Sequence, residues 1–144
     1  IRAFNSLANG GYLVQPQVVK EIWQEGNDSY QPKTEKSKKI YSQQTVDQMK
    51  QMMITAVEQG GTKWIDKEGL SVAGKTGTAQ IAIKGDYAEE KTLASFVGYA
   101  PANNPKFVML ISLQEPKSSP WGSETAAPVW FNIAKRLAYY WNLK

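Results

Sequence analysis

The sequence predicts an α+β domain in which an antiparallel sheet is flanked by helices. Three consecutive segments near the middle of the chain, 72–83, 93–100 and 106–113, have strand character and are joined by short polar connections. Short connections between consecutive strands place them side by side and antiparallel. Helical patterns precede and follow this run, at 42–59 and 124–141. Strands grouped in this way between helices are typical of the α+β class.

The first forty residues predict one helix and a small hairpin. Residues 2–9 have helical character and stop at the Asn-Gly-Gly sequence that follows, where glycine accepts the left-handed conformation of a helix C-terminus. Residues 18–23 (VVKEIW) predict a strand, and the polar residues 24–38 show no periodicity and predict a loop. We expect residues 39–41 (KIY) to pair back with that strand.

The central helix has the clearest boundaries in the sequence. Ser42 is a suitable N-cap, apolar residues recur at helical spacing, and a Gly-Gly pair after Gln59 ends the pattern. We expect the methionines of this helix to pack in the core, where their flexible side chains fill irregular gaps. The apolar positions are Val46, Met49, Met53, Ala56 and Val57.

The strands and the last helix carry their own signals. A charged loop at 84–92 joins the first strand to the second, and residues 101–105 (PANNP) form a turn between the second and the third. The apolar run 107–111 is typical of a strand covered on both faces. In the last helix Pro128 fits only within the first turn. One apolar stripe runs along this helix through Trp130, Ala134, Leu137 and Trp141.

Composition limits the possible functions. A chain of 144 residues with 42% hydrophobic residues suits one globular domain, 1–144, with a core of its own. The sequence contains no cysteine and no histidine, which excludes a Ser-His-Asp triad, a Cys-His pair and an ordinary zinc site within this chain. We expect no metal and no cofactor. The net charge of +4 is modest, and its densest stretch, 33–39, is a solvated loop. No arrangement of aromatic and basic residues resembles a known nucleic-acid reader, so we expect no nucleic-acid binding.

Neither a run of membrane-spanning length nor a signal peptide is evident in the sequence. The chain begins at Ile1 within a helical pattern. We therefore expect it to be a piece of a longer protein.

Residues 73–80 (AGKTGTAQ) fit two different chemistries. Gly69-x-x-x-x-Gly74-Lys75-Thr76 formally matches a phosphate-binding P-loop, and would make the chain a nucleotide-binding module. A P-loop needs a buried strand before it and a helix that starts at its Lys-Thr pair. Residues 64–68 are mixed and turn-like, and residues 78–83 alternate like a strand, so the context of a P-loop is missing.

The strand interpretation of this stretch accounts for more residues. Side chains alternate along a strand, so Lys75 and Gly77 share one face and Thr76 and Thr78 share the other. An edge strand of this kind can bind a peptide by strand addition, and an ammonium with hydroxyl groups beside it suits a carboxylate. Strict alternation separates Lys75 from both threonines, so a shared site requires a twisted strand or one approached along its edge.

The segments around this motif resemble a known family. They match, in order, the C-terminal part of the transpeptidase domain of class B penicillin-binding proteins, and the ASF and EPK…AAP sequences resemble the division-type members more than the elongation-type ones. The resemblance covers essentially the whole chain. The matching segments are residues 8–11 (ANGG), 59–62 (QGGT), 73–80 (AGKTGTAQ), 94–101 (ASFVGYAP), 115–117 (EPK) and 126–129 (AAPV).

The resemblance implies a peptidoglycan D,D-transpeptidase, in which a serine attacks the carbonyl of a D-Ala-D-Ala stem peptide and β-lactams acylate the same serine. It implies that Lys75 is a catalytic residue that supplies positive charge near the substrate carboxylate. The hydroxyls of Thr76 and Thr78 would bind that carboxylate beside Gly77, and the N–H of Thr78 would form half of the oxyanion hole.

The family's other two motifs, Ser-x-x-Lys and Ser-x-Asn, do not occur in this sequence. We therefore expect the chain to be incomplete as a transpeptidase domain, to need the N-terminal half of that domain as a partner, and to be inactive alone.

The resemblance also implies a location on the extracytoplasmic face of the bacterial membrane, a membrane-anchored parent and division proteins as further partners. A penicillin-recognising sensor or a β-lactamase is the alternative within the same fold. The 84–92 loop, with Tyr87, would border the mouth of the site as a substrate-contacting flap or form a mobile solvent loop. Trp121, in the loop before the last helix, could cover the sheet or rim the cleft, and we expect it to pack against the sheet.

Overall fold

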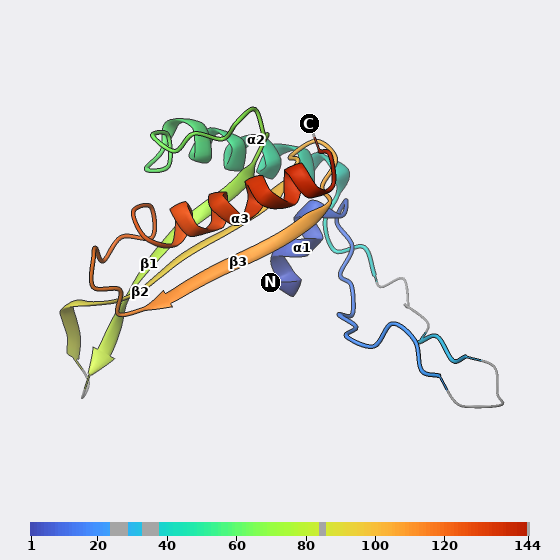
Figure 1. Ribbon diagram of the computed structural model, residues 1–144, viewed down its shortest axis with the longest axis horizontal. Coiled ribbons are helices and arrows are strands. Elements are labelled where there is room, and N and C mark those ends of the chain that lie inside the picture. The colour runs from blue at the N-terminus through green and yellow to red at the C-terminus, as the bar shows by residue number, and fades with distance from the viewer. Residues whose placement is uncertain (24–28, 33–37, 84–85, 144) are drawn as a thin grey trace.

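A computed structural model describes residues 1–23, 29–32, 38–83 and 86–143. Its sheet has the strand order β1-β2-β3, and both neighbouring pairs are antiparallel. The predicted α+β fold, an antiparallel sheet flanked by helices, is confirmed (Figure 1). The elements in chain order are α1 (Arg2–Ala8), α2 (Gln43–Gln59), β1 (Ala73–Ile83), β2 (Asp86–Ala100), β3 (Phe107–Gln114) and α3 (Ala126–Tyr140).

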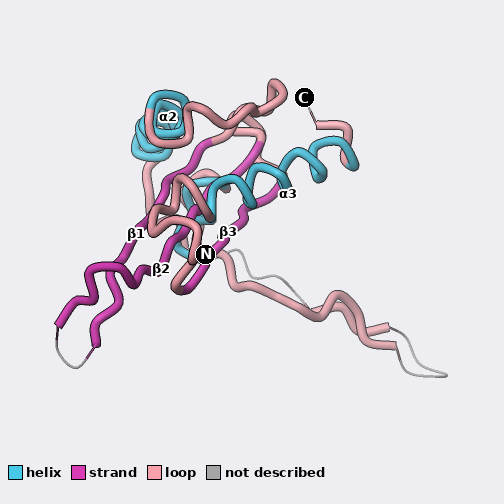
Figure 2. Tube along the Cα trace, turned by 60° about the vertical axis from the view of Figure 1, so that its left-hand side comes forward, coloured by secondary structure: helices cyan, strands magenta, loops and turns pink. Residues whose placement is uncertain are grey.

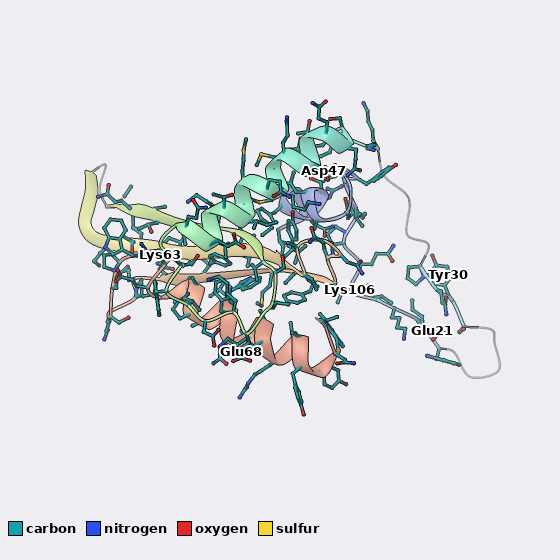
Figure 3. The ribbon with its side chains drawn as sticks, turned by 90° about the horizontal axis from the view of Figure 1, so that it is seen from above. Glu21, Tyr30, Asp47, Lys63, Glu68 and Lys106 are labelled. Atoms are coloured by element: carbon teal, nitrogen blue, oxygen red, sulfur yellow. The ribbon has the colours of Figure 1, made fainter. Side chains whose placement is uncertain are left out.

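The two longer helices lie on opposite faces of the sheet, as the view from above shows, with α2 on one side of the strands and α3 on the other (Figure 3). The strands supply each face with alternate side chains. Phe96 of β2 faces α3, whereas its near neighbour Tyr99 faces the first two helices. Each face therefore has its own hydrophobic cluster.

The cluster under α3 is built around an aromatic group. Trp130 is fully buried, meets Phe96 edge-on with ring centroids 5.1 Å apart, and donates its indole N–H to the carbonyl of Met109 at 2.9 Å. This bond satisfies the one polar atom of a buried indole. Pro128 is the third residue of α3, within its first turn as predicted. The predicted stripe is buried at Trp130 and Ala134 but ends at Trp141, which is 45% exposed.

Helix α2 begins and ends where the sequence predicts. The Ser42 hydroxyl accepts a hydrogen bond from the N–H of Thr45 at 3.1 Å, and Gly60 follows the last helical residue. Met53 is buried in the cluster shared with α1, as expected. The expectation is wrong for Met49, which is 36% exposed at the flank of the buried face of the helix.

The segment after α1 corrects the predicted hairpin. Residues 18–23 form no strand; Ile22 makes one isolated bridge to Tyr30, and Val18 is fully exposed. Residues 39–41 pair elsewhere: Lys39 bridges Tyr12, and the carbonyl of Gly11 accepts from the next two backbone N–H groups. The 18–23 segment runs along an extended arm that leaves the body of the molecule, where no strand of the sheet can pair with it (Figure 1).

The β1–β2 connection corrects a second prediction. Most of the segment 84–92 is not a loop, because β2 already begins at Asp86 and the ladder includes the pairs Ala82↔Tyr87 and Ile83↔Asp86. Residues 84 and 85 lie outside the described residues. The two strands form a long ribbon that extends beyond both long helices (Figure 2). The register shifts between Gln80 and Ala82, from Gln80↔Thr92 to Ala82↔Tyr87, so residues 88–91 have no partner on β1 and form a bulge within β2.

The third strand is covered less completely than its apolar sequence predicts. Phe107, Met109, Ile111 and Leu113 pack against the cluster under α3. On the other face Val108 meets the second cluster, but Leu110 is 45% exposed.

Among the described residues, no helix combines the length and apolar character needed to cross a lipid bilayer.

Candidate active site

The Lys-Thr-Gly-Thr motif lies in the first half of β1, at one edge of the described sheet. Among the described residues, those of the motif pair only with β2, through Lys75↔Val97 and Thr76↔Phe96 in one continuous register. The P-loop interpretation is therefore wrong. Lys75 and Thr76 are the third and fourth residues of a strand that continues to Ile83, so no helix N-terminus is available there for a phosphate.

The pairing also assigns the faces of the motif. Thr76 is opposite Phe96 and shares its face, the α3 side, with Thr78. Lys75 lies on the other face with Gly77, whose partner on β2 is Ser95. The predicted alternation is confirmed. It raises the question of how an ammonium on one face can act together with hydroxyls on the other.

The open edge of the strand answers that question. The Lys75 side chain folds against its own strand, and its Nζ atom donates to the carbonyl of the next residue, Thr76, at 3.0 Å. It also lies 3.4 Å from the Thr76 hydroxyl oxygen, to which it donates. The lysine side chain is exposed and that of Thr76 is partly exposed. The cation and the first hydroxyl therefore meet beside the edge.

The backbone at this edge presents further polar groups. In an antiparallel ladder, the N–H and C=O of one residue point to the same side, and successive residues alternate. The Thr76 carbonyl accepts from Lys75 on the open side of the strand. The carbonyl of Gly77 instead accepts from the Ser95 hydroxyl on β2 at 3.5 Å. The same alternation directs the Thr78 N–H away from β2, toward the side that the Thr76 carbonyl faces.

The Thr78 hydroxyl has a partner that sequence reasoning missed. It accepts a hydrogen bond of 3.1 Å from the backbone N–H of Gly122, which is 44 residues later in the loop before α3. The signal in the sequence is slight, a glycine between a tryptophan and a helix start. No local pattern indicates that this glycine reaches β1.

Trp121, next to that glycine, corrects another expectation. Its side chain is 56% exposed and so does not pack into the sheet. Its backbone is nevertheless fixed, because its carbonyl accepts from the hydroxyl of Thr125 at 2.7 Å and its N–H donates to Ser119 at 3.2 Å.

The groups gathered at this edge suit an anionic ligand with a peptide-like backbone. They are one ammonium, two hydroxyls and the outward backbone groups of an edge strand, and the described residues contain no cluster of His, Cys, Asp or Glu that could hold a metal ion. A separate cavity of about 540 Å³ lies between the 67–70 segment and the C-terminal half of α3, and none of the motif residues lines it.

Comparisons with known proteins agree with this geometry. The family described as "Penicillin binding protein transpeptidase domain" matches residues 1–137. Among curated relatives, Stage V sporulation protein D of Bacillus subtilis is 34% identical over 142 residues, which cover 94% of this chain and 21% of that protein. Peptidoglycan D,D-transpeptidase FtsI of Buchnera aphidicola is 34% identical over 111 residues, 75% of this chain and 19% of the relative. The chain thus spans about a fifth of the length of these relatives.

Solved structures show the same fold. Penicillin-binding protein 3 of Mycobacterium tuberculosis, in complex with aztreonam, superposes with a TM-score of 0.81 at 26% identity and covers 99% of this chain and 34% of its own. The transpeptidase domain of penicillin-binding protein 3 from Burkholderia pseudomallei gives a TM-score of 0.80 at 27% identity, over 99% of this chain and 41% of that one. The matched family spans nearly the full length of the chain, including the Lys-Thr-Gly-Thr edge strand, and the chain belongs to the penicillin-binding protein transpeptidase domain family.

Proposed function

We propose that the protein to which this chain belongs is a serine-type peptidoglycan D,D-transpeptidase that cross-links the cell wall, and that this chain supplies the Lys-Thr-Gly wall of its active site. The observation that carries the proposal is the convergence of the Lys75 ammonium and the Thr76 hydroxyl, 3.4 Å apart, beside the open edge of β1. Relatives named peptidoglycan D,D-transpeptidases support it.

In the proposed reaction a serine from outside this chain attacks the carbonyl carbon between the two D-alanines of a stem peptide. The carbonyl oxygen becomes an oxyanion, and the C–N bond then breaks to release D-alanine and leave an acyl-serine ester. An amine of a neighbouring strand attacks that ester and restores the serine hydroxyl. A β-lactam acylates the same serine, with its own ring amide as the bond that breaks.

In that reaction this chain would stabilise two negative charges, the terminal carboxylate of the substrate and the oxyanion. The Lys75 ammonium attracts the terminal carboxylate, and the hydroxyls of Thr76 and Thr78 donate to its oxygens. The Thr78 N–H points out of the sheet edge and would stabilise the oxyanion together with the N–H of the serine. Loss of one such donor typically costs about 3 kcal/mol of transition-state stabilisation. Gly77, on the Lys75 face of the strand, would leave room beside the lysine for the ligand.

The proposal also covers the rest of the protein. The chain has neither Ser-x-x-Lys nor Ser-x-Asn, so the nucleophile would come from the N-terminal half of the domain, and the chain alone would be inactive. The domain would work on the extracytoplasmic face of the bacterial membrane, in a membrane-anchored parent. The relative named FtsI, together with the ASF and EPK…AAP sequences, supports a division-type role with division proteins as partners. Structural neighbours in complex with aztreonam and ampicillin support β-lactams as ligands.

The test uses a synthetic stem pentapeptide and the full-length protein to which this chain belongs, called the full-length parent below. Release of D-alanine that depends on Lys75 and is blocked by benzylpenicillin is the expected result. A parent that binds penicillin covalently but releases no D-alanine would contradict transpeptidation. Slow turnover of the bound drug would then indicate a penicillin sensor, and rapid turnover a β-lactamase.

A further inference from the structure

The Thr78 hydroxyl is held in a defined orientation by a residue distant in sequence. The N–H of Gly122 donates to its oxygen at 3.1 Å. A threonine hydroxyl has one proton to donate and two lone pairs that accept. Because Gly122 occupies one lone pair, the proton of Thr78 is directed away from Gly122 and remains available to an acceptor at the strand edge.

Only glycine fits at position 122. A Cβ atom there would lie 2.5 Å from the carbonyl oxygen of Gly77 and 2.5 Å from that of Ser95. Both atoms belong to the backbone of the central ladder and cannot turn aside as a side chain can. Gly122 is buried against the sheet, whereas the Thr78 side chain it holds is exposed. A larger residue would lift the loop and break the bond to Thr78.

The loop that carries Gly122, residues 119–125, is fixed on both sides of the glycine. Its hydrogen bonds are Thr92 Oγ1 to Pro120 O at 2.8 Å, Thr125 Oγ1 to Trp121 O at 2.7 Å and Ala127 N to Gly122 O at 2.9 Å. The first of these bonds comes from a buried residue of β2. The Gly122 N–H is thus presented to β1 by a preorganised backbone, as an accurate positioning contact requires.

We propose that Gly122 is a positioning residue for recognition of the ligand carboxylate: it holds the Thr78 hydroxyl as a donor for that carboxylate and does not itself touch the ligand. The proposal rests on the proposed function for the identity of the ligand. It adds that the loop before α3 controls how well the site distinguishes a carboxylate from its neutral ester.

The experiment compares benzylpenicillin with its methyl ester as acylating agents of the full-length parent. Gly122→Ala is expected to lower the second-order acylation rate about tenfold for the carboxylate and less than about twofold for the ester, the range expected for one lost hydrogen bond to a charged group. Gly61→Ala is the matched control. Its Cβ would lie 3.0 Å from the Ser123 Cβ in the same loop without approaching Thr78, and it should leave the carboxylate-to-ester ratio unchanged.

A double-mutant cycle separates positioning from general damage. In a Thr78→Val background Gly122→Ala should have less than about a twofold further effect, because the hydroxyl it serves is gone. In a Thr78→Ser background, which keeps a hydroxyl, the full effect should return. The proposal would be overturned if Gly122→Ala and the parent had the same carboxylate-to-ester ratio of acylation rates. It would also be overturned if the effects of Gly122→Ala and Thr78→Val on the rate simply multiplied.

Hydrogen exchange at the Gly122 amide tests the bond even if Gly122→Ala does not fold. Exchange in the folded parent should be slow and should stay slow in Thr78→Ser, but should accelerate severalfold in Thr78→Val. Equal exchange in all three proteins would overturn the positioning role. Failure of the proposed function has a different signature, namely no covalent labelling of the unmodified parent by either compound.

Discussion

The ammonium of Lys75 lies 3.4 Å from the hydroxyl oxygen of Thr76, although the two side chains leave β1 on opposite faces of the sheet. They meet because β1 is at the edge of the described sheet, where a long side chain can fold around the strand and reach its neighbour's carbonyl at 3.0 Å. The edge, rather than either face, is therefore the surface on which the polar groups of the motif converge.

Removal of the Lys75 charge should slow acylation strongly. Lys75→Met keeps an unbranched side chain one atom shorter but removes its charge, and hydrogen bonds to charged groups contribute about 1.5–3 kcal/mol. We expect the second-order rate of benzylpenicillin acylation of the full-length protein to fall by about a hundredfold. Lys75→Arg should recover part of that loss. A Lys75→Met rate equal to that of the parent would remove the lysine from the site.

Thr76 should contribute through its hydroxyl alone. Thr76→Val preserves the shape of the side chain, so we expect a stable protein whose acylation rate is about tenfold lower. Thr76→Ser, which keeps the hydroxyl, should retain most of the rate. Parallel melting curves control for folding. If the valine variant reacts as fast as the serine variant, the hydroxyl is not a carboxylate donor.

Gly74 and Gly77 should differ in their tolerance of a methyl group. At Gly74 a Cβ would lie 2.6 Å from the ring of Phe96 and 2.8 Å from the carbonyl oxygen of Val97, both held in the core. At Gly77 the nearest atom is the hydroxyl of Ser95, which can rotate away. Gly74→Ala should therefore lower the free energy of unfolding by about 1–3 kcal/mol, and Gly77→Ala by less than about 1 kcal/mol. Urea unfolding of both variants measures the difference, and equal losses would contradict this account.

The buried Tyr99 hydroxyl should make stability depend on alkaline pH. Burial first, and the negative charge of Asp47 second, raise the pKa of Tyr99 from 10.0 to about 12. The unfolded chain loses this proton near pH 10 while the folded chain keeps it, so the stability present below pH 10 is lost as the pH rises toward 12. Tyr99→Phe should abolish this part of the pH dependence.

The same variant should be more stable near neutral pH. The Tyr99 hydroxyl is buried and has no hydrogen-bond partner among the described residues, so its removal should raise the free energy of unfolding by about 1 kcal/mol. Urea unfolding at about pH 8 and pH 11 tests both statements. Tyr139→Phe, at a side chain that is almost fully exposed, is the control and should change neither value. If Tyr99→Phe loses as much unfolding free energy between about pH 8 and pH 11 as the unmodified protein does, groups other than Tyr99 cause that loss.

Sequence periodicity located the elements whose signals are local. The Ser42 cap, the glycines after α2 and the turn after β2 depend on neighbouring residues, and the structure confirms each of them. Signals that depend on distant partners failed. Residues 18–23 have strand composition but no sheet edge beside them, and residues 86 and 87 have loop composition but pair with Ile83 and Ala82 of β1.

The candidate site divides in the same way. Lys75, Thr76 and Thr78 are visible in the sequence because they lie within four consecutive residues of a recognisable motif. Gly122 is not, because its contact with Thr78 exists only after the sheet and the loop before α3 have packed together. The alternation of side chains predicted a conflict between Lys75 and Thr76 that only the geometry of an edge strand resolves.

Covalent labelling with a fluorescent penicillin tests the central claim most directly. The full-length parent should form a stable labelled band that unlabelled penicillin abolishes, and Lys75→Met should weaken it. The 144-residue chain alone should label no more than background, because it lacks the Ser-x-x-Lys nucleophile. A folded parent that carries that motif but takes up no label, or a strong label on the isolated chain, would contradict the account.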